Sequence, residues 1–443
     1  MKLCIIASGD YFSSYGGGQV YVKNLVKGLQ ERGDDITVVS LLQDETVKVE
    51  KELKEDNGIP VWQIKIPLSS IALDRPFELQ DIIAKPLGEI FSKIKPDIVH
   101  ANGWKYAASK VCKERGIPCV VTAHHGGIVC PNGMLMNADD AICTVPASME
   151  NCLKCALHFV PGGDFWSPVV QALPEKIAFH IGRSLKNIRN IPYVSHAFKQ
   201  PLGIHHKLQQ MKVLTYAPDR LIAPSRAIAS ALVRNGVAEN KVTVIPHGIV
   251  PFEKKPLEAG LPKRVLRFGY VGRISYVKGL HVVIEALALL PKGANYALHI
   301  YGDAATKSER RYRDALKEKS KDLPVIWHGK VNYEDIARTY SAFDVMLLPS
   351  IYLEVFGLTV LESFSSGRPV IATRCGGPED TIIDDVDGVL VEPNSAEALA
   401  AILKKCIDEV KYVEELASNI SKVNTLERHL VDLEKIYEEI HHG

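Results

Sequence analysis

The feature that most constrains this chain is an alternation of short β-branched runs with amphipathic helical stretches, which restarts once in the second half. The first set of predicted strands comprises residues 2–7, 36–40, 98–101, 119–123, 220–223 and 241–246. After a polar stretch at 251–263, the second set comprises 266–271, 296–301, 325–328, 345–348 and 369–373. Strands that alternate with helices form parallel sheets covered on both faces. The pattern predicts an α/β protein with two doubly wound parallel sheets and a linker at 251–263.

Length and composition agree with two globular domains. A chain of 443 residues exceeds one ordinary core. The 53 Lys and Arg residues nearly balance the 52 Asp and Glu residues, so the charge gives no reason to expect a nucleic-acid partner. The apolar run at the N-terminus is too short for a signal segment, and the nine cysteines are then expected to be reduced thiols. These features predict a cytoplasmic protein without a transmembrane helix.

The predicted organisation is a Rossmann-like domain over 1–252, a second one over 264–423 and a C-terminal helix over 424–443. Sheets of this type bind ligands outside the carboxyl ends of their strands, so an active site is expected in a central cleft between the domains. Apolar residues recur at helical spacing from Leu426 to Ile440. This helix either covers its own domain or crosses back to the first domain.

One segment is strongly biased in charge. No acidic residue occurs between Glu175 and Asp219, whereas seven basic residues do, namely Lys176, Arg183, Lys186, Arg189, Lys199, Lys207 and Lys212. Apolar residues are interleaved with them, so the segment is either a solvated basic face or a surface for an anionic membrane or acceptor.

The first predicted strand is followed by a glycine-rich turn that opens an amphipathic helix. Gly17 and Gly18 belong to the run Gly-Gly-Gly at 16–18. Glycines at such a turn let backbone N–H groups approach a ligand, and a helix N-terminus favours phosphate. A tight turn that only needs positive φ explains the same residues equally well.

A basic pair follows the first strand of the second half. Arg273 and Lys278 lie five positions apart, between the strand that ends at Val271 and the next helix. Two cations at the carboxyl end of a strand can bind a diphosphate from two sides and neutralise charge on a leaving nucleotide.

An acidic pair follows a later strand of the second half. Glu354 falls in the loop after the strand, and Glu362 falls about two turns into the next helix, among Val360, Leu361 and Phe364. A carboxylate in so apolar a run needs a partner. The hydroxyl groups of a ribose would supply one, and backbone N–H groups near Gly357 could hold a phosphate or part of a sugar.

Together these motifs resemble glycosyltransferase family 4, the glycosyl transferases group 1, whose retaining members have the GT-B fold. The Gly-rich turn, the Arg-x4-Lys pair and the Glu-x7-Glu pair occur in the family's order and spacing, as do the stretches 344–350 and 366–372. The resemblance covers nearly the whole chain. It implies that the C-terminal helix crosses back to the first domain.

The resemblance also implies roles for single residues. Gly17 and Gly18 would lie against the donor phosphates, Arg273 and Lys278 would bind the diphosphate, Glu354 would contact the donor sugar, and Glu362 would bind the ribose. Phe356, Gly357 and Leu358 would offer backbone contacts. His124 matches the family's histidine beside the reacting sugar, although simple packing remains an alternative. Two departures, His125 and His247, fall at positions where relatives often have other residues, and they bear on substrate preference.

The implied reaction moves a sugar from a UDP- or GDP-sugar to a hydroxyl group of a glycan or glycolipid, in polysaccharide, lipopolysaccharide or glycolipid synthesis. The acceptor would attack from the face that the diphosphate leaves, so the anomeric configuration is retained. The Asp-x-Asp string at Asp385 and Asp387 reads as a surface turn, so no catalytic metal is expected. The protein would be cytoplasmic, with a peripheral contact at the inner face of a membrane as one option.

Four cysteines form a second candidate site. Cys130, Cys143, Cys152 and Cys155 follow the pattern Cys-x12-Cys-x8-Cys-x2-Cys within an insertion at 128–160. Four thiolates that end in a Cys-x2-Cys knuckle suit tetrahedral zinc. A structural zinc ion is the favoured interpretation, with unligated thiols and an iron–sulfur cluster as the alternatives.

Two other functions fit a chain of this fold class. A nucleotide-sugar epimerase would use the same donor without an acceptor, and an inactive scaffold would bind a partner protein. The spacing of the basic and acidic pairs argues against both. A dinucleotide oxidoreductase is disfavoured, because no Gly-x-Gly-x-x-Gly follows a predicted strand.

Overall fold

The computed structural model describes residues 1–7, 9–13, 17–44, 48–67, 78–160, 162–185, 194–253, 265–420 and 423–442. Gly16 and most of the predicted linker lie outside these ranges. The chain divides into two compact units. Unit 1 comprises Met1–Asp139, Cys143–Pro246 and Leu426–Gly443, and unit 2 comprises Asp140–Ile142 and His247–Thr425.

Unit 1 is built on an eight-stranded sheet with the order β3-β4-β2-β1-β5-β6-β7-β8. All neighbouring strands are parallel except β3 and β4, which form an antiparallel pair. The strands are β1 (Lys2–Ile6), β2 (Asp35–Asp44), β3 (Glu50–Asp56), β4 (Ile59–Pro67), β5 (Ile98–Ala101), β6 (Cys119–Thr122), β7 (Arg220–Ala223) and β8 (Val242–Val244). The six strands predicted for this half are present, and the pair β3 and β4 is an addition to them.

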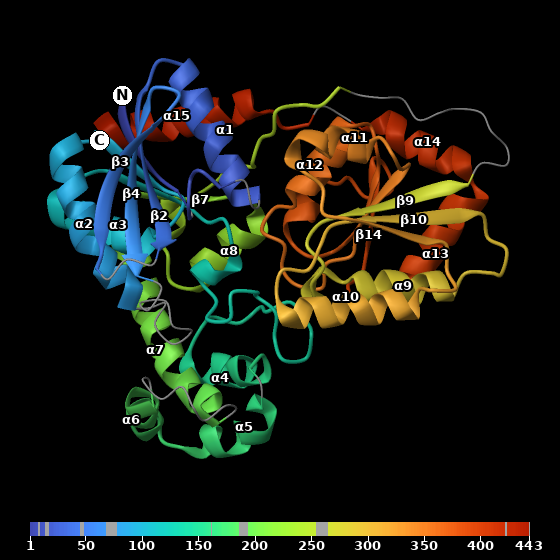
Figure 1. Ribbon diagram of the computed structural model, residues 1–443, viewed down its shortest axis with the longest axis horizontal. Coiled ribbons are helices and arrows are strands. Elements are labelled where there is room, and N and C mark those ends of the chain that lie inside the picture. Colours follow the sequence, from blue (N-terminus) through green and yellow to red (C-terminus); the bar gives the residue numbers. More distant parts are fainter. Residues whose placement is uncertain are drawn as a thin grey trace. The chain divides into compact units, whose positions relative to one another are not determined.

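The helices of unit 1 connect these strands and cover the sheet (Figure 1). They are α1 (Gly17–Glu31), α2 (Glu78–Ile94), α3 (Lys105–Arg115), α4 (Met149–His158), α5 (Gly163–Ala172), α6 (Glu175–Leu185), α7 (Val194–Tyr216), α8 (Arg226–Arg234) and α15 (Leu426–His442), with short 3-10 turns at Gly126–Ile128 and Glu239–Lys241.

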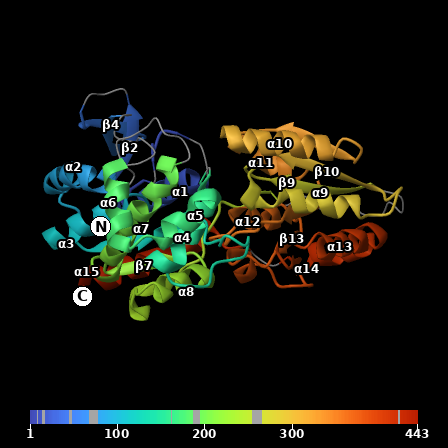
Figure 2. The same cartoon turned by 90° about the horizontal axis from the view of Figure 1, so that it is seen from below.

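Helices α4 to α7 form a separate group between β6 and β7, and they lie together in both views (Figures 1 and 2). They have a small core of their own, in which Leu157, Val170 and Ala197 are buried. The basic segment predicted at 175–219 therefore consists of α6 and α7, apart from residues outside the described ranges. Most of its described charges face outward, but Lys207 is buried.

The C-terminal helix α15 belongs to unit 1, which confirms that it returns to the first sheet (Figure 1). Leu430, Leu433, Ile436 and Tyr437 join the core that α1 forms with β1. The two helices approach so closely that a Cβ at Gly28 of α1 would lie 2.5 Å from Leu430.

Unit 2 is a six-stranded parallel sheet with the order β11-β10-β9-β12-β13-β14. The strands are β9 (Leu266–Val271), β10 (Tyr296–Tyr301), β11 (Val325–Gly329), β12 (Val345–Leu348), β13 (Val370–Thr373) and β14 (Gly388–Val391), and only β14 was not predicted. Its helices are α9 (Leu280–Ala288), α10 (Lys307–Lys319), α11 (Ile336–Tyr340), α12 (Leu358–Ser365), α13 (Ala396–Asp408) and α14 (Val410–Asn419), with 3-10 turns at Tyr276–Lys278, Tyr333–Asp335 and Gly377–Asp380.

The strand order of unit 2 places a topological switch point at its centre. The first strand, β9, lies between β10, which follows it in sequence, and β12, which follows after a crossover. Sheets of this type bind ligands at the carboxyl ends of the strands beside such a point. In the described part of the chain, no helix is both long and apolar enough to cross a membrane.

Candidate active site

The loops that follow β9, β12 and β13 in unit 2 are joined by backbone hydrogen bonds. The N–H of Ile351 donates to the carbonyl of Val277 at 2.9 Å. The N–H of Glu354 donates to the carbonyl of Cys375 at 2.7 Å, and the N–H of Gly377 donates to the carbonyl of Glu354 at 2.8 Å. These bonds fix the backbone at the carboxyl edge of the sheet, where the predicted acidic and basic residues lie.

Two glycines permit these loops to approach each other. Gly279 has a φ of 71°, and a Cβ at this position would lie 1.8 Å from the carbonyl oxygen of Pro349. A Cβ at Gly377 would lie 2.3 Å from the Cα of Phe356. No larger residue fits either position unless the backbone moves.

Lys278 and Glu354 form an ion pair at this edge. The ammonium group lies 2.5 Å from Oε1 of Glu354 and 5.0 Å from the centre of the Tyr352 ring. The hydroxyl groups of Ser350 and Tyr352 also donate to the carboxylate, at 2.6 and 2.9 Å. Burial of Glu354 is the largest single influence and disfavours its charge, but the charge of Lys278 and the hydrogen bonds from Lys278, Ser350 and Tyr352 together outweigh it and lower the pKa of the carboxyl group.

Arg273 contacts a different acid from the one that Lys278 contacts. Its side chain is 59% exposed, and Nε lies 3.4 Å from Oε1 of Glu309, which also caps the N-terminus of α10. Between the two cations, the hydroxyl group of Ser275 is buried and has no hydrogen-bond partner among the described residues. The two predicted cations therefore contact different acids, Glu309 and Glu354. The hydroxyl group of Ser275, which lies between them in sequence, is free to bond a ligand.

The predicted backbone-contact residues lie where α12 begins. Gly357 precedes the helix with a φ of 81°, and no side chain caps this end. Phe356 is buried, and its ring packs edge-on against His247 with the ring centres 5.3 Å apart. Leu358 is the first residue of the helix. An uncapped helix N-terminus offers N–H groups and partial positive charge to an anion.

Glu362 lies on the second turn of α12 and is partly buried. Its Oε2 accepts a hydrogen bond from the hydroxyl group of Tyr340 at 2.8 Å. Burial raises the pKa of the carboxyl group to about 7, although the bond from Tyr340 acts in the opposite direction. The predicted need of this carboxylate for a partner is thus met in part by the protein itself.

His124 of unit 1 follows β6, and its imidazole contacts the end of β5. Its Nε2 lies 2.6 Å from Oδ1 of Asn102, the first residue after β5. The ring packs against Tyr21 of α1, with the ring centres 4.7 Å apart. Gly17 and Gly18 are the first two residues of α1.

Helix α15 supplies hydrogen-bond partners to residues of β5 and α1 in unit 1. Its residue Tyr437 bonds His100 of β5 at 2.6 Å, and its His429 bonds Tyr21 at 2.7 Å. Burial lowers the pKa of His100 to about 3 and that of His429 to about 4, so both rings are neutral.

The zinc expectation at the four cysteines receives no support. Cys152 and Cys155 lie one turn apart on α4, and Cys130 and Cys143 are near enough to affect the pKa of both thiols. However, no group of three or more His, Cys, Asp or Glu side chains is arranged to hold a metal ion within the described ranges, which include all four cysteines. Cys130 instead contacts Oδ1 of Asn132 at 2.7 Å, and burial raises the pKa of Cys152 to about 12, which favours the neutral thiol.

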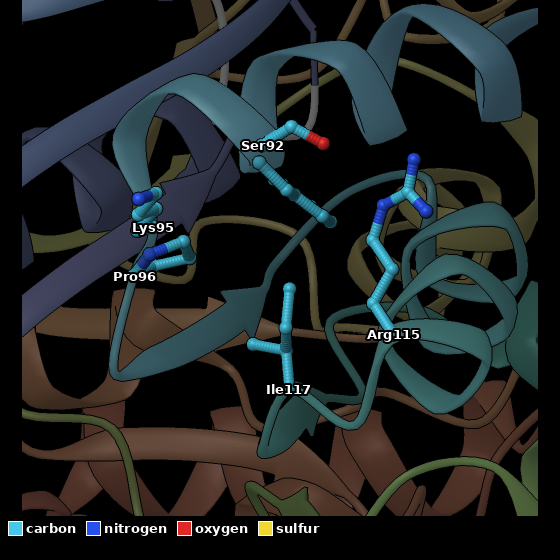
Figure 3. Close-up of a pocket in the computed structure, with 6 residues that line it drawn as sticks. Ser92, Lys95, Pro96, Arg115 and Ile117 are labelled. Atoms are coloured by element: carbon cyan, nitrogen blue, oxygen red, sulfur yellow. The ribbon is translucent and has the colours of Figure 1, made fainter.

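A cavity of about 440 Å³ lies elsewhere in unit 1 (Figure 3). Its lining residues come from the end of α2, the end of α3 and the segments that lead into β5 and β6, namely Phe91, Ser92, Lys95, Pro96, Arg115 and Ile117. It therefore lies at the amino ends of these strands, away from His124.

Two family profiles match the chain. The profile described as glycosyl transferases group 1 matches residues 252–423, and that described as glycosyltransferase family 4 matches residues 15–137. Together they cover about two-thirds of the chain. The matched residues include His124 of unit 1 and the basic and acidic pairs of unit 2.

The chain belongs to glycosyltransferase family 4.

Curated relatives of this family 4 protein support the assignment. An uncharacterized glycosyltransferase of Methanocaldococcus jannaschii is 25% identical over 271 residues, which are 55% of this chain and 67% of the relative. D-inositol 3-phosphate glycosyltransferase of an Arthrobacter strain is 30% identical over 201 residues, 43% of this chain and 48% of the relative. The matched part thus spans about half to two-thirds of these relatives.

A solved structure supports the fold. HepE of Anabaena in complex with UDP has a TM-score of 0.64 at 18% identity, over 99% of this chain and all of that one. The family 4 protein therefore has the GT-B fold that the sequence predicted.

The structure adds residues that the sequence analysis of this family 4 protein missed. Ser350 and Tyr352 donate hydrogen bonds to Glu354. They lie only four and two residues before it, so their nearness in sequence could have identified them. Tyr340 lies on α11, and nothing in its local sequence pointed to Glu362.

Proposed function

We propose that this protein transfers a sugar from a nucleoside-diphosphate sugar to a hydroxyl group, with retention of anomeric configuration. The observation that carries the proposal is the ion pair between the partly buried Lys278 and the buried Glu354 at the carboxyl edge of the unit 2 sheet. A buried carboxylate is costly to maintain and often marks a functional site. HepE, which has the same fold, was solved with UDP.

Each part of the donor has a candidate partner in unit 2. Lys278 and Arg273 would neutralise the diphosphate, with the N-terminus of α12 at Gly357 and the buried hydroxyl of Ser275, which bonds no described residue, as further donors. The carboxylate of Glu354 can accept hydrogen bonds from sugar hydroxyl groups, and Glu362 can accept them from a ribose. Phe356 and Leu358 would contribute backbone contacts.

Retention is the outcome that we propose for an acceptor that attacks on the face from which the diphosphate leaves. Positive charge around the diphosphate stabilises the leaving group, and the acceptor hydroxyl would attack from the side that the diphosphate vacates. His124 is our candidate for the polar group at the anomeric centre, because Asn102 and Tyr21 fix its ring. Gly17 and Gly18 are candidates for contacts with the donor phosphates.

The test is an assay with UDP-, GDP- and ADP-sugars in which sugar transfer, donor hydrolysis and donor epimerisation are followed separately. We expect transfer with one nucleotide series and a product with the donor's anomeric configuration. Epimerisation without transfer would identify an epimerase, and binding without any reaction would identify a scaffold. Either result contradicts the proposal.

We further propose that the acceptor is a glycan or glycolipid presented at a membrane surface, as in polysaccharide, lipopolysaccharide or glycolipid synthesis. Phe165 and Val169 on α5 and Ile177 on α6 are exposed, with Phe165 at 78%. Lys176 and Arg183 are exposed beside them in sequence. Apolar side chains flanked by basic ones suit the interface of an anionic membrane.

Vesicle pelleting tests this contact. Vesicles with anionic lipid should pellet the protein at low salt and less of it at moderate salt. The variant Phe165→Ser should bind less, whereas Phe12→Ser, which removes an exposed phenylalanine elsewhere in unit 1, should bind like the wild type. Absence of binding at low salt contradicts the membrane contact and leaves the sugar transfer untouched.

A further inference from the structure

Unit 1 buries two lysines at the carboxyl ends of β5 and β6. Lys105 begins α3, directly after β5, and is 5% exposed. Lys207 comes from the middle of α7 and is 8% exposed. The two meet around Tyr106, whose hydroxyl oxygen accepts a bond from the Lys207 ammonium at 2.7 Å. Buried lysines are rare, because a cation loses its hydration there.

Neither lysine has an acidic partner among the described residues. Among the described residues, the Lys105 ammonium donates to the carbonyl of Asn102 at 2.7 Å, and the Lys207 ammonium donates to the hydroxyl oxygen of Tyr106. Burial, together with the charge of Lys207, lowers the pKa of Lys105 to about 7. Burial lowers the pKa of Lys207 to about 8. The cluster therefore holds positive charge that no acidic side chain in the described ranges compensates.

Other groups at the same place are also donors. Asn102 is fully buried; its Oδ1 contacts His124, but its Nδ2 has no hydrogen-bond partner among the described residues. Lys105 is the first residue of α3, and the side chain of Trp104 does not cap this helix. A helix N-terminus carries partial positive charge and disfavours a lysine. The site thus has an unused donor, Nδ2 of Asn102, and the described residues supply no carboxylate to balance its two lysines.

From this geometry we propose that Lys105, Lys207 and Asn102 bind a phosphate monoester on the acceptor. A phosphate monoester carries about −1.5 to −2 charges at pH 7, which balances two lysines, and its oxygens accept from several donors. A carboxylate would balance only one lysine. The assignment of the phosphate to the acceptor rests on the proposed function, since His124 shares Asn102 with this site.

The direct test measures binding of inorganic phosphate by thermal shift and calorimetry, against chloride at matched ionic strength. The wild type should bind phosphate. Lys105→Met and Lys207→Met should each bind it roughly tenfold more weakly or worse, because each removes charge-assisted hydrogen bonds. Lys113→Met on the exposed side of α3 is the matched control and should bind phosphate like the wild type.

A second variant keeps the test decisive if a methionine variant does not fold. Asn102→Asp places a carboxylate beside Lys105, so it should fold and should lose phosphate binding. Equal phosphate binding by the wild type and the Lys105 and Asn102 variants overturns the proposal, as does the absence of a phosphate effect above that of chloride. Stabilisation by glucuronate but not by phosphate would also overturn it.

Two further arms identify the source of the phosphate and separate this proposal from the proposed function. A monosaccharide phosphate should bind more tightly than inorganic phosphate if the group belongs to an acceptor, and equal binding would overturn the acceptor assignment. Donor nucleotides are titrated into the same variants. Phosphate binding without any nucleotide binding defeats the proposed function and leaves the anion site standing; nucleotide binding without phosphate binding does the reverse.

Discussion

The two units treat positive charge at the carboxyl ends of their strands in opposite ways. In unit 2, Lys278 forms an ion pair with Glu354, and the hydroxyl groups of Ser350 and Tyr352 also donate to the carboxylate. In unit 1, Lys105 and Lys207 lie together without a carboxylate among the described residues. A paired charge is held in place before any ligand arrives, whereas unpaired charges need a ligand to balance them. Removal of a lysine should therefore have effects of opposite sign in the two units.

The largest effect is expected at the paired lysine. Lys278→Met leaves Glu354 buried without its counter-ion and should lower the free energy of unfolding by about 3–5 kcal/mol. Urea denaturation measures this loss. The double variant Lys278→Met with Glu354→Gln should recover most of the stability but no sugar transfer. A single variant as stable as the wild type would show that the buried carboxylate of Glu354 does not depend on Lys278.

A smaller effect is expected from the close approach of the unit 2 loops. Gly279→Ala places a Cβ against the carbonyl of Pro349 and should cost about 2–3 kcal/mol. Gly116→Ala in unit 1 is the matched control, because Gly116 has a similar φ of 65° but no atom within 4 Å of the added Cβ. That change should cost only about 1 kcal/mol. Equal losses of unfolding free energy would show that the loops of unit 2 can move apart freely.

Glu362 gives a pH-dependent test within unit 2. Its pKa of about 7 in the folded protein, against an ordinary value of 4.5, means that folding favours the protonated acid. Its contribution to stability is present below pH 4.5 and is lost as the pH rises to 7. Relative to Glu362→Gln, the wild type should therefore lose free energy of unfolding over this range.

Donor binding should show the opposite trend. If the ribose donates to the ionised carboxylate, the dissociation constant of the nucleotide should rise about fivefold between pH 7 and pH 6, because the ionised fraction of Glu362 falls over this range. Calorimetric titration at several pH values would measure this change. Glu362→Gln should bind with a weaker affinity that no longer varies over this range, and an unchanged pH dependence would exclude Glu362 from the ribose site.

The smallest effect, and the one of opposite sign, is expected in unit 1. Lys105→Met replaces a buried cation with an apolar side chain and should raise the free energy of unfolding by about 1 kcal/mol below pH 7. Because burial lowers the pKa of Lys105 from 10.5 to about 7, the penalty in the wild type declines as the pH rises through this range. The stability gained by Lys105→Met should therefore decline as the pH rises from 7 toward 10.5. A loss of stability at pH 6 would contradict the comparison.

The sequence sufficed for much of the fold, for a physical reason. Buried parallel strands such as Val345–Leu348 are continuous apolar runs, which remain visible without tertiary information. Strand β3, by contrast, has the sequence Glu-Lys-Glu-Leu-Lys-Glu-Asp, and it is a strand because β4 pairs with it. The sequence pattern did not predict this strand, because an edge strand with charged side chains lacks an apolar pattern.

The candidate site divides in the same way. Glu354 and Lys278 were predicted because fixed spacings place them after strands, but their ion pair depends on loops that meet only in the folded sheet. Lys207 was assigned to a basic surface segment, and it is buried because it meets Tyr106, 101 residues earlier in the chain. Partners so distant in sequence leave no local pattern.

The most direct test of the central claim is calorimetric titration of UDP, GDP and ADP into the wild type and into the double variant Lys278→Met with Glu354→Gln. Lys404→Met, which alters an exposed lysine of unit 2, serves as the control. We expect one nucleotide to bind the wild type and the control alike, and the double variant to lose at least about tenfold in affinity. Equal affinity of the double variant and the wild type would contradict the assignment of the donor site to this edge of unit 2.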